Sequence, residues 1–334
     1  MDHWQRIEAA AAGDRVDRLP ISLWRHFPED DLDPAGLAGH MVSWQRKWDF
    51  DLVKFMPSGT YGVEDWGAVT AYQGAANGAR AVVKNGLTRT EDWPRLARLD
   101  PRKGVLGQQI EALRLAAREL GGGAPILQTI FSPLTTARKL AGERVFADMR
   151  RMPEALEAGL RIITDATIEF ALASLEAGAH GFFLATQCAS YRVATEGEYT
   201  RFGKRYDLEI FGALKGKTRL DLLHLHGEDV MFDLLADYPV SLINWHDRLT
   251  APTLSDALTR FPRLLVGGVE ENRTLTSGPE DAIGAAVRDA VAQTGGRRLM
   301  IGAGCVLLTA TPEVHIRAAV DAARRAGSMT SRWG

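Results

Sequence analysis

The chain has 334 residues, of which 46% are hydrophobic and 25% are charged, and its formal net charge is −2 at pH 7. This composition excludes a disordered or fibrous protein, and the charge provides no global attraction to nucleic acid or to an anionic membrane. We therefore expect small-molecule substrates and protein partners, with no nucleic acid or membrane partner, and leave a homodimer open.

The cysteines and the N-terminal residues indicate the cellular compartment in which the protein is expected. Two cysteines are too few for a disulfide framework, which favours a reducing environment. Residues 1–20 have the pattern of an amphipathic helix and lack the basic start and apolar centre of a signal peptide. No stretch approaches the roughly 20 apolar residues of a membrane span. The expected location is cytoplasmic.

Short apolar runs, typical of buried strands, recur along the whole chain. They fall at 19–25, 50–56, 125–131, 180–186, 219–226, 240–245, 263–268 and 298–304. Segments with helical apolar spacing fall in the intervals at 107–121, 148–178, 227–238, 254–261 and 279–295, and after the last run at 312–327. Buried strands alternating with helices predict an α/β fold with a parallel sheet covered on both faces.

The number of these units predicts a single (β/α)8 TIM-type barrel domain spanning 1–334. An open doubly wound sheet remains the alternative, although no G-x-G-x-x-G motif follows the first run and no P-loop is present. Residues 57–123 are long for one β-to-α connection, so we expect this insertion to build part of the active site.

In such a barrel the active site lies where the strands end, and polar residues follow most of the apolar runs. Acid–base chemistry and binding of a substrate carboxylate point to four candidate catalytic residues: Arg25, His26, His246 and Asp247. Aromatic and polar side chains in the insertion and after later strands are candidates for cofactor binding: Tyr61, Glu64, Trp66, Gln187 and Glu270.

The segment "LLHLHGEDV" indicates a metal site. His224 and His226 are two residues apart on a strand, so both side chains leave the same face. Cys305, which follows the glycines of "IGAG" after the last strand, supplies a thiolate as a third ligand. Three nitrogen and sulfur ligands with one open position are typical of catalytic Zn²⁺.

Two alternatives remain at this site. The histidine pair is also compatible with a hydrogen-bonded strand end that holds no metal. Cys188 competes with Cys305 as the ligand, although "ATQCASY" has the pattern of a helix start. If a metal is bound, Asp247 or Glu270 is expected to accept a hydrogen bond from the second ring nitrogen of a ligating histidine.

Five segments resemble the uroporphyrinogen decarboxylase superfamily and span nearly the whole chain. They are "DRLPISLWRHF", "WDFDLVKFMPSGTYGVEDWG", "GAHGFFLATQCASY", "GVEENRTLTSGPEDAI" and "GAGCVLLTATPEVHIRAAVDAAR". The last is similar to the superfamily's G-x-G-x-x-x-x-x-x-P-E-x-V ending. The resemblance implies a distorted (β/α)8 barrel.

The superfamily contains decarboxylases and corrinoid-linked methyltransferases, and the sequence departs from the decarboxylases. Their R-Q-A-G-R block is "RHFPED" here, their aspartate is missing after "KFM", and Cys305 replaces a histidine. The methyltransferases bind zinc through an H-x-C pair and a cysteine in the final block. "HLHG" with "GAGC" resembles that arrangement, with His226 in place of one cysteine.

The resemblance therefore implies a zinc-dependent enzyme that transfers a methyl group between a corrinoid, presented by a partner protein, and a thiol or similar acceptor. Decarboxylation of a tetrapyrrole or a small aromatic acid is the second interpretation, with Arg25 holding a carboxylate and His26 or His246 moving protons. A non-catalytic barrel that binds a corrinoid or tetrapyrrole is the third.

Overall fold

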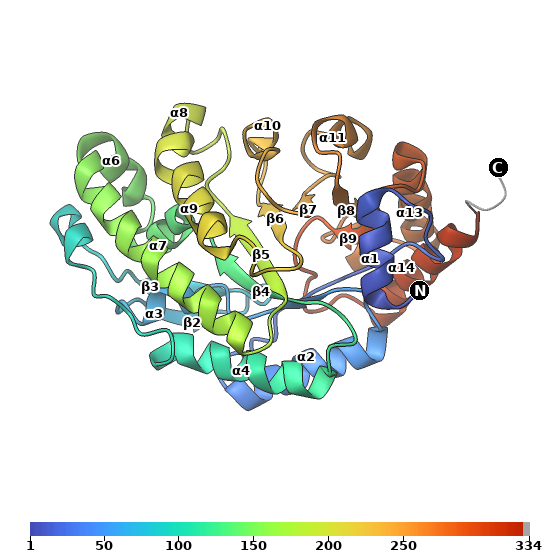
Figure 1. The fold of residues 1–334 in the computed structure, drawn as a ribbon, viewed down its shortest axis with the longest axis horizontal. Helices are drawn as coiled ribbons and strands as arrows, with labels where there is room; N and C mark the ends of the chain where they lie inside the picture. Colours follow the sequence, from blue (N-terminus) through green and yellow to red (C-terminus); the bar gives the residue numbers. More distant parts are fainter. Residues whose placement is uncertain (330–334) are drawn as a thin grey trace.

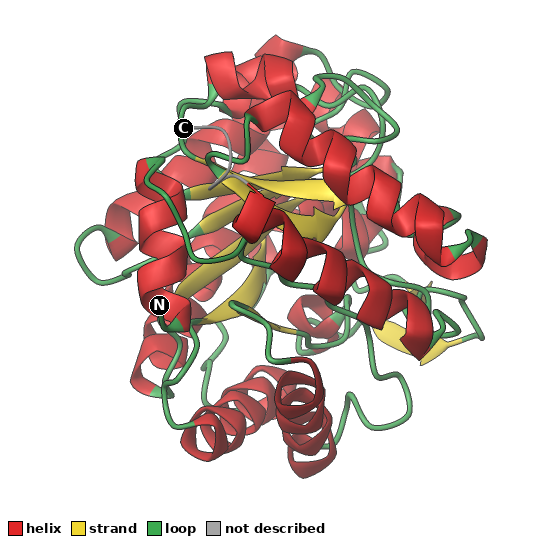
Figure 2. Cartoon of the chain, turned by 90° about the vertical axis from the view of Figure 1, so that its right-hand side faces the viewer, coloured by secondary structure: helices red, strands yellow, loops and turns green. Residues whose placement is uncertain are grey.

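A computed structural model describes residues 1–329 and shows a strongly curved parallel sheet enclosed by helices (Figures 1 and 2). The sheet has the order β1-β4-β5-β6-β7-β8-β9. Its strands are β1 (Val53–Phe55), β4 (Ile126–Phe131), β5 (Gly181–Thr186), β6 (Leu222–Leu225), β7 (Leu242–Trp245), β8 (Leu264–Val269) and β9 (Leu299–Ala303). Every residue in these strands is buried, as expected for a sheet covered on both faces.

The first apolar run closes the barrel without forming a regular strand. Ile21 makes a single parallel bridge with Ile301 of β9. The Ile301 amide donates to the Pro20 carbonyl (2.8 Å), and on the other side the Asp51 amide donates to the Ile21 carbonyl (2.9 Å). The predicted eight-unit barrel is thus confirmed, with its first unit reduced to an extended segment between β9 and the start of β1.

The helices follow the strands around the barrel, as Figure 1 shows. Before the first full strand lie α1 (His3–Ala12) and α2 (Pro34–Trp48). The helices between later strands are α4 (Gly104–Leu120), α5 (Pro133–Ala141), α6 (Arg144–Arg151), α7 (Pro153–Glu176), α8 (Glu196–Tyr199), the π-helical turn η2 (Thr200–Lys204), α9 (Arg205–Leu214), α10 (Phe232–Leu235), α11 (Leu254–Arg260), α12 (Thr274–Ser277) and α13 (Glu280–Thr294). The final helix is α14 (Glu313–Met329). Among the described residues, no helix is both long enough and apolar enough to cross a membrane.

Local sequence explains several helix ends. Asp2 caps α1 in a reciprocal capping box with Gln5, and Pro34 occupies the first turn of α2. The single helix expected over 148–178 is divided, because Pro153 cannot continue α6 and instead begins α7. The helix expected over 227–238 is shorter, since only Phe232–Leu235 is helical.

The insertion forms structure of its own. It contains the short helix α3 (Tyr61–Glu64), the antiparallel hairpin β2 (Val69–Tyr72) and β3 (Arg80–Lys84), and the 3-10 helix η1 (Thr90–Arg95). Figure 2 shows the hairpin as a small two-stranded sheet at the periphery, separate from the barrel strands. The hairpin was not predicted from the sequence.

A buried ion cluster anchors the N-terminal segment at the end of the barrel opposite the strand C-termini. The Asp51 carboxylate is fully buried and accepts hydrogen bonds from Arg6 (2.6 Å), Arg18 (2.6 Å) and the Ile21 amide (2.9 Å). His3 also contacts this carboxylate at 2.9 Å. Burial raises the pKa of Asp51, but its contacts with His3 and Arg18 outweigh burial and hold the pKa below the ordinary value.

Candidate metal centre

Four side chains converge where β6, β7 and β9 end. His224 lies within β6, His226 follows the strand, His246 follows β7, and Cys305 lies two residues beyond β9. Each offers one ligand atom, and all four atoms lie within 4.8 Å of one another. The predicted set of His224, His226 and Cys305 is therefore brought together, and His246, predicted as catalytic, joins it.

The distances in this cluster match a tetrahedral zinc site. Zn–N bonds of about 2.05 Å and a Zn–S bond of about 2.3 Å at tetrahedral angles place nitrogen and sulfur about 3.6 Å apart. Cys305 Sγ lies 3.7 Å from His224 Nε2 and 3.5 Å from His226 Nδ1. The donor set, imidazole nitrogen and cysteine sulfur, is also one that zinc prefers. The residues present fit the metal.

Asn244 orients the first histidine. It lies opposite His224 in the register of β6 and β7, and its Oδ1 is 2.6 Å from His224 Nδ1. The Asn244 amide nitrogen donates to the carbonyls of Val266 (2.8 Å) and Ala303 (3.0 Å), which turns Oδ1 toward the histidine. His224 must therefore carry its proton on Nδ1, and its Nε2 lone pair faces Cys305.

His246 has a carboxylate neighbour on one side and no hydrogen-bond partner on the other. Its Nδ1 lies 3.0 Å from Glu271 Oε1, an ion-pair contact without hydrogen-bond alignment, and its Nε2 is buried without a partner among the described residues. Burial lowers the pKa of His246, but the contacts with Cys305 and Glu271 outweigh burial and raise the pKa to about 10. The buried Nε2–H of the charged ring therefore lacks an acceptor, which an anionic ligand at the cluster would supply.

The sulfur of Cys305 favours the thiolate. Burial raises its pKa, but the surrounding imidazoles of His224, His226 and His246 outweigh burial and hold the pKa well below the ordinary cysteine value. Cys188 is fully buried, its Sγ faces the Leu134 carbonyl at 3.9 Å, and burial raises its pKa to about 11. Cys188 therefore belongs to the core, and its segment is irregular chain rather than the predicted helix start.

The expectation that Asp247 or Glu270 supports the histidine pair is wrong. Both Asp247 oxygens lie 3.2 Å from the Gly268 amide, and one lies 3.3 Å from Arg248 Nε. The Glu270 carboxylate accepts hydrogen bonds from the backbone amides of 272–274. Asn244 fills the predicted role at His224, and Glu271 contacts His246.

A cavity of about 250 Å³ opens beside the cluster. His224, His226 and Cys305 line it, so a ligand in the cavity reaches the ligand atoms directly. Part of the predicted insertion forms one wall of this cavity, through Pro57, Gly59, Thr60, Asn77, Ala79 and Arg80. The volume lies below the roughly 300–1,000 Å³ of pockets for drug-sized ligands, so the cavity suits a small molecule.

Of the two other predicted catalytic residues, His26 lines this cavity and Arg25 does not. His26 lines it, is 8% exposed, and has an Nδ1 without a hydrogen-bond partner among the described residues. Burial and the charge of Lys54 lower the pKa of His26 to about 3, so its ring is neutral. Arg25 instead donates to the Thr309 carbonyl (3.2 Å) and lies over the Phe27 ring, outside the cavity lining.

Only one of the five predicted cofactor-binding residues, Gln187, lines the cavity. Tyr61 donates to the Thr129 carbonyl (2.8 Å), Trp66 donates to the Ala97 carbonyl (2.8 Å), and Glu64 accepts from Thr70 (2.8 Å). Glu270 is committed to the backbone amides described above. In each case a local hydrogen bond turns the side chain away from the cluster.

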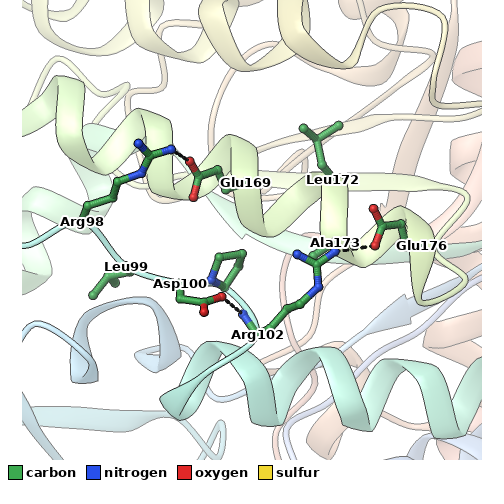
Figure 3. Close-up of a pocket in the computed structure, with 9 residues that line it drawn as sticks. Arg98, Leu99, Asp100, Arg102, Glu169, Leu172, Ala173 and Glu176 are labelled. Carbon is green, nitrogen blue, oxygen red and sulfur yellow. Dashed lines mark hydrogen bonds and ion pairs between the residues drawn. The ribbon is translucent and has the colours of Figure 1, made fainter.

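Another hollow, of about 500 Å³, lies between the 98–102 segment and α7 (Figure 3). Its charged side chains pair with one another, Arg98 with Glu169 and Arg102 with Glu176, as the dashed lines in Figure 3 mark. Its lining contains no histidine or cysteine. The hollow is larger than the cavity beside the metal cluster, but it lacks the imidazole and thiolate ligands found there.

Comparison with known proteins agrees with the resemblance seen in the sequence. A family model described as uroporphyrinogen decarboxylase (URO-D) matches residues 46–326. The chain is 22% identical over 246 residues to the methylcobamide:CoM methyltransferase MtbA of Methanosarcina acetivorans, covering 73% of this chain and 71% of that protein. It is 26% identical over 215 residues to the methylcobamide:CoM methyltransferase MtaA of Methanosarcina barkeri, covering 64% and 62%.

Solved structures share the fold. A methyltransferase from Methanosarcina mazei matches with a TM-score of 0.85 at 22% identity, covering 97% of this chain and 98% of that one. A B12-independent methionine synthase from Shewanella sp. W3-18-1 matches with a TM-score of 0.58 at 13% identity, covering 94% and 93%. At these identities the likeness shows the barrel architecture alone.

Proposed function

The chain belongs to the uroporphyrinogen decarboxylase family and is a methyltransferase-like enzyme within it, and we propose that it transfers a methyl group between a corrinoid and a thiol with the help of bound zinc. The observation that carries this proposal is the His224, His226 and Cys305 cluster, whose N–S distances of 3.7 and 3.5 Å match tetrahedral zinc. The similarity to methylcobamide:CoM methyltransferases supports the same reaction class.

Each residue of the cluster has its own role in the proposed reaction. His224 Nε2, His226 Nδ1 and Cys305 Sγ would hold the ion, and the contact with Asn244 would fix the tautomer of His224. Bound zinc lowers the pKa of a thiol so that the thiolate is available at neutral pH. His246, which its raised pKa keeps charged at neutral pH beside Glu271, would stabilise the thiolate from Nε2, and the thiol proton would leave to solvent. The methyl donor would be a corrinoid presented by a partner protein, and the similarity to methylcobamide:CoM methyltransferases supports a corrinoid as donor.

The cavity argues against decarboxylation of uroporphyrinogen. A volume of about 250 Å³ is small even for a drug-sized ligand, and a molecule of four linked pyrroles is larger than that. Arg25, the residue assigned to a substrate carboxylate in that alternative, lies outside the cavity lining. A ligand cluster with a buried, unpartnered nitrogen also disfavours a barrel without chemistry.

The test combines metal analysis with turnover. Untagged protein should contain about one zinc per chain, and the zinc-loaded protein should convert free methylcobalamin and a thiol into the S-methyl product, followed by loss of methylcobalamin absorbance and by mass spectrometry. His224→Ala and Cys305→Ala should lose both zinc and activity, while Glu271→Gln should keep zinc and lose rate. Full methyl transfer by metal-free protein would refute the proposal, and conversion of uroporphyrinogen to coproporphyrinogen would establish the decarboxylase alternative.

A further inference from the structure

The β2–β3 hairpin is attached to the rest of the described chain mainly at its loop and at its two ends. Its strands pair with each other, and three of their apolar side chains, Val69, Tyr72 and Val83, are between 39% and 49% exposed. Val82 is half-buried and packs against the hydrophobic core. Elements with so little buried apolar surface move more readily than buried strands, so the hairpin can shift while the barrel stays in place.

The loop of the hairpin, residues 73–79, forms part of the cavity wall and rests on the rim of the barrel. Asn77 and Ala79 line the cavity. The Ala76 carbonyl accepts hydrogen bonds from the Thr309 amide (2.8 Å) and from the Thr309 hydroxyl (3.1 Å). Thr309 follows Cys305 in the same segment beyond β9, so the loop leans on the segment that carries the predicted thiolate ligand.

Arg80, the first residue of β3, makes the second attachment. Its Nε donates to Asp31 Oδ1 (2.8 Å), and its Nη2 donates to the Pro28 carbonyl (3.1 Å). Asp31 is only 1% exposed, so this ion pair is shielded from water. Pro28 and Asp31 follow the first unit of the barrel, whereas Thr309 follows the last, and the hairpin therefore bridges the place where the barrel closes.

Glycines at both ends of the hairpin permit movement. Gly67, just before β2, has φ +86°, in the left-handed region that glycine adopts without strain. Gly86 lies just after β3, and a Cβ added there would lie 2.8 Å from the Trp66 carbonyl oxygen. The two ends of the hairpin are therefore close neighbours, and small backbone rotations at these glycines would turn the hairpin about one axis.

The size of the proposed methyl donor requires such a movement. The cavity of about 250 Å³ is too small for a corrin macrocycle, yet the methyl carbon must come to about 3–3.5 Å from the thiolate sulfur before transfer. Part of the cavity wall must move aside when the donor approaches. The hairpin loop belongs to that wall and is held to the rim by one ion pair and three hydrogen bonds with carbonyl acceptors.

We propose that the β2–β3 hairpin is a gate: it turns on Gly67 and Gly86, releases its loop from the barrel rim and admits a macrocyclic methyl donor that the closed cavity excludes. This inference rests on the proposed methyl transfer, which supplies the large donor. With the loop seated on Thr309 the hairpin shields the cluster from bulk water, as closed lids do in other enzymes.

A pair of glycine variants in the same loop tests the gate. Gly78 has φ +76°, and a Cβ there would lie 2.8 Å from His26 Cβ and 3.0 Å from Thr309 Cγ2. Gly78→Ala should therefore wedge the loop away from the rim. Gly74 has φ +78°, but a Cβ there meets no atom of the described residues within 4 Å. Gly74→Ala is the matched control, because it carries the same backbone strain without the rim contact.

Two measurements on metal-free protein in a Cys188→Ser background report opening. The first is hydrogen–deuterium exchange at the Thr309 amide, whose acceptor lies in the hairpin loop. The second is alkylation of Cys305 by bulky fluorescein maleimide relative to small iodoacetamide. We expect both the exchange rate and the bulky-to-small ratio to rise at least about 10-fold in Gly78→Ala, since losing one hydrogen bond shifts an equilibrium by about that factor. Gly74→Ala should stay within about twofold of the starting protein.

A second pair of variants addresses the ion pair. Arg80→Met removes the attachment to Asp31 and should raise both signals. Arg18→Met is its control: Arg18 also pairs with a fully buried aspartate, Asp51, and its side chain is 15% exposed against 11% for Arg80. Melting curves identify any general loss of stability. Signals that stay at the starting level in Gly78→Ala and Arg80→Met, or that rise in all four variants in proportion to lost stability, overturn the inference.

Turnover keeps failure of the gate distinct from failure of the proposed function. Zinc-loaded variants are given methylcobalamin and a thiol. Methyl transfer at one common rate in all variants, with both opening signals unchanged, overturns the gate and leaves methyl transfer standing. Opening signals that rise in Gly78→Ala and Arg80→Met, without methylation of any thiol by any variant, support a gated cavity and refute the proposed function.

Discussion

Replacing Asn244 tests the orientation of the metal cluster most directly. Asn244 is fully buried and makes three hydrogen bonds, to His224 Nδ1 and to the carbonyls of Val266 and Ala303. In Asn244→Leu all three are lost, and at about 1 kcal/mol each the free energy of unfolding should fall by about 3 kcal/mol. His224 can then adopt the other tautomer, so zinc affinity should fall by roughly 10- to 100-fold.

A second variant at the same position separates the two effects. In Asn244→Asp one oxygen still accepts from His224, so zinc affinity should be kept, while the other oxygen faces the two carbonyls and stability should fall. The assays are competition for zinc against a chromophoric chelator and urea denaturation of the metal-free protein. Asn272→Leu, an exposed asparagine near the end of β8, serves as the control.

The zinc affinities of three variants test the role of Asn244. If folded Asn244→Leu binds zinc within about twofold of the wild type, Asn244 does not fix the ligand geometry. Asp247→Asn and Glu270→Gln should leave zinc affinity unchanged, because neither carboxylate contacts a histidine of the cluster. A large loss in either variant would likewise contradict the assignment.

Three further predictions concern the cysteines and the N-terminal ion cluster. Cys305→Ser should lose zinc while Cys188→Ser retains it, and equal zinc contents by mass spectrometry would contradict the assignment of the ligand. In metal-free protein at about pH 6, iodoacetamide should modify Cys305 before Cys188, because the histidines lower the pKa of Cys305 whereas burial raises that of Cys188; zinc should protect Cys305, and peptide mapping that finds Cys188 modified first would rule this out. Asp51→Asn should lower the free energy of unfolding by about 3 kcal/mol at neutral pH, because Arg18 loses the ion pair with Asp51 and Arg6 keeps only its pair with Asp17. The folded pKa of Asp51 lies below its ordinary value of 3.8, so the difference from wild type should be full above that pH and shrink as the pH falls through the folded pKa. A difference in urea denaturation that is constant from neutral to acidic pH would show that the charge of Asp51 is not its source.

The barrel was predictable because its strands are buried on both faces and therefore appear as apolar runs. The first run was predicted as a strand like the others, yet only Ile21 is bridged. Pro20 has no N–H to donate, so the ladder with β9 depends on the Pro20 carbonyl and the Ser22 amide. The β2–β3 hairpin went unnoticed because its side chains are half-buried or exposed and give no apolar run.

The cluster of candidate metal ligands was predictable from the spacing of His224 and His226, but the residue that orients His224 was not predicted. Strand side chains alternate, so Asn244 and His246 leave one side of β7 and Trp245 leaves the other. That alternation alone disfavours Asp247 as a neighbour of the cluster. Lys139, which also lines the cavity, could not have been found in this way, because it lies on α5 and reaches the cavity only through packing.

The closure of the barrel by the 19–22 segment has a consequence for the order of assembly. Ile21 meets β9 across 280 positions of the chain, a contact of very high sequence separation, and such contacts form slowly because a long loop must close first. Cys305 follows that same strand, so it reaches His224 and His226 only when β9 has docked. Capture of a metal by all three residues would therefore require a docked β9, and a ribosome-bound chain that lacks this strand would have the histidines without the thiolate.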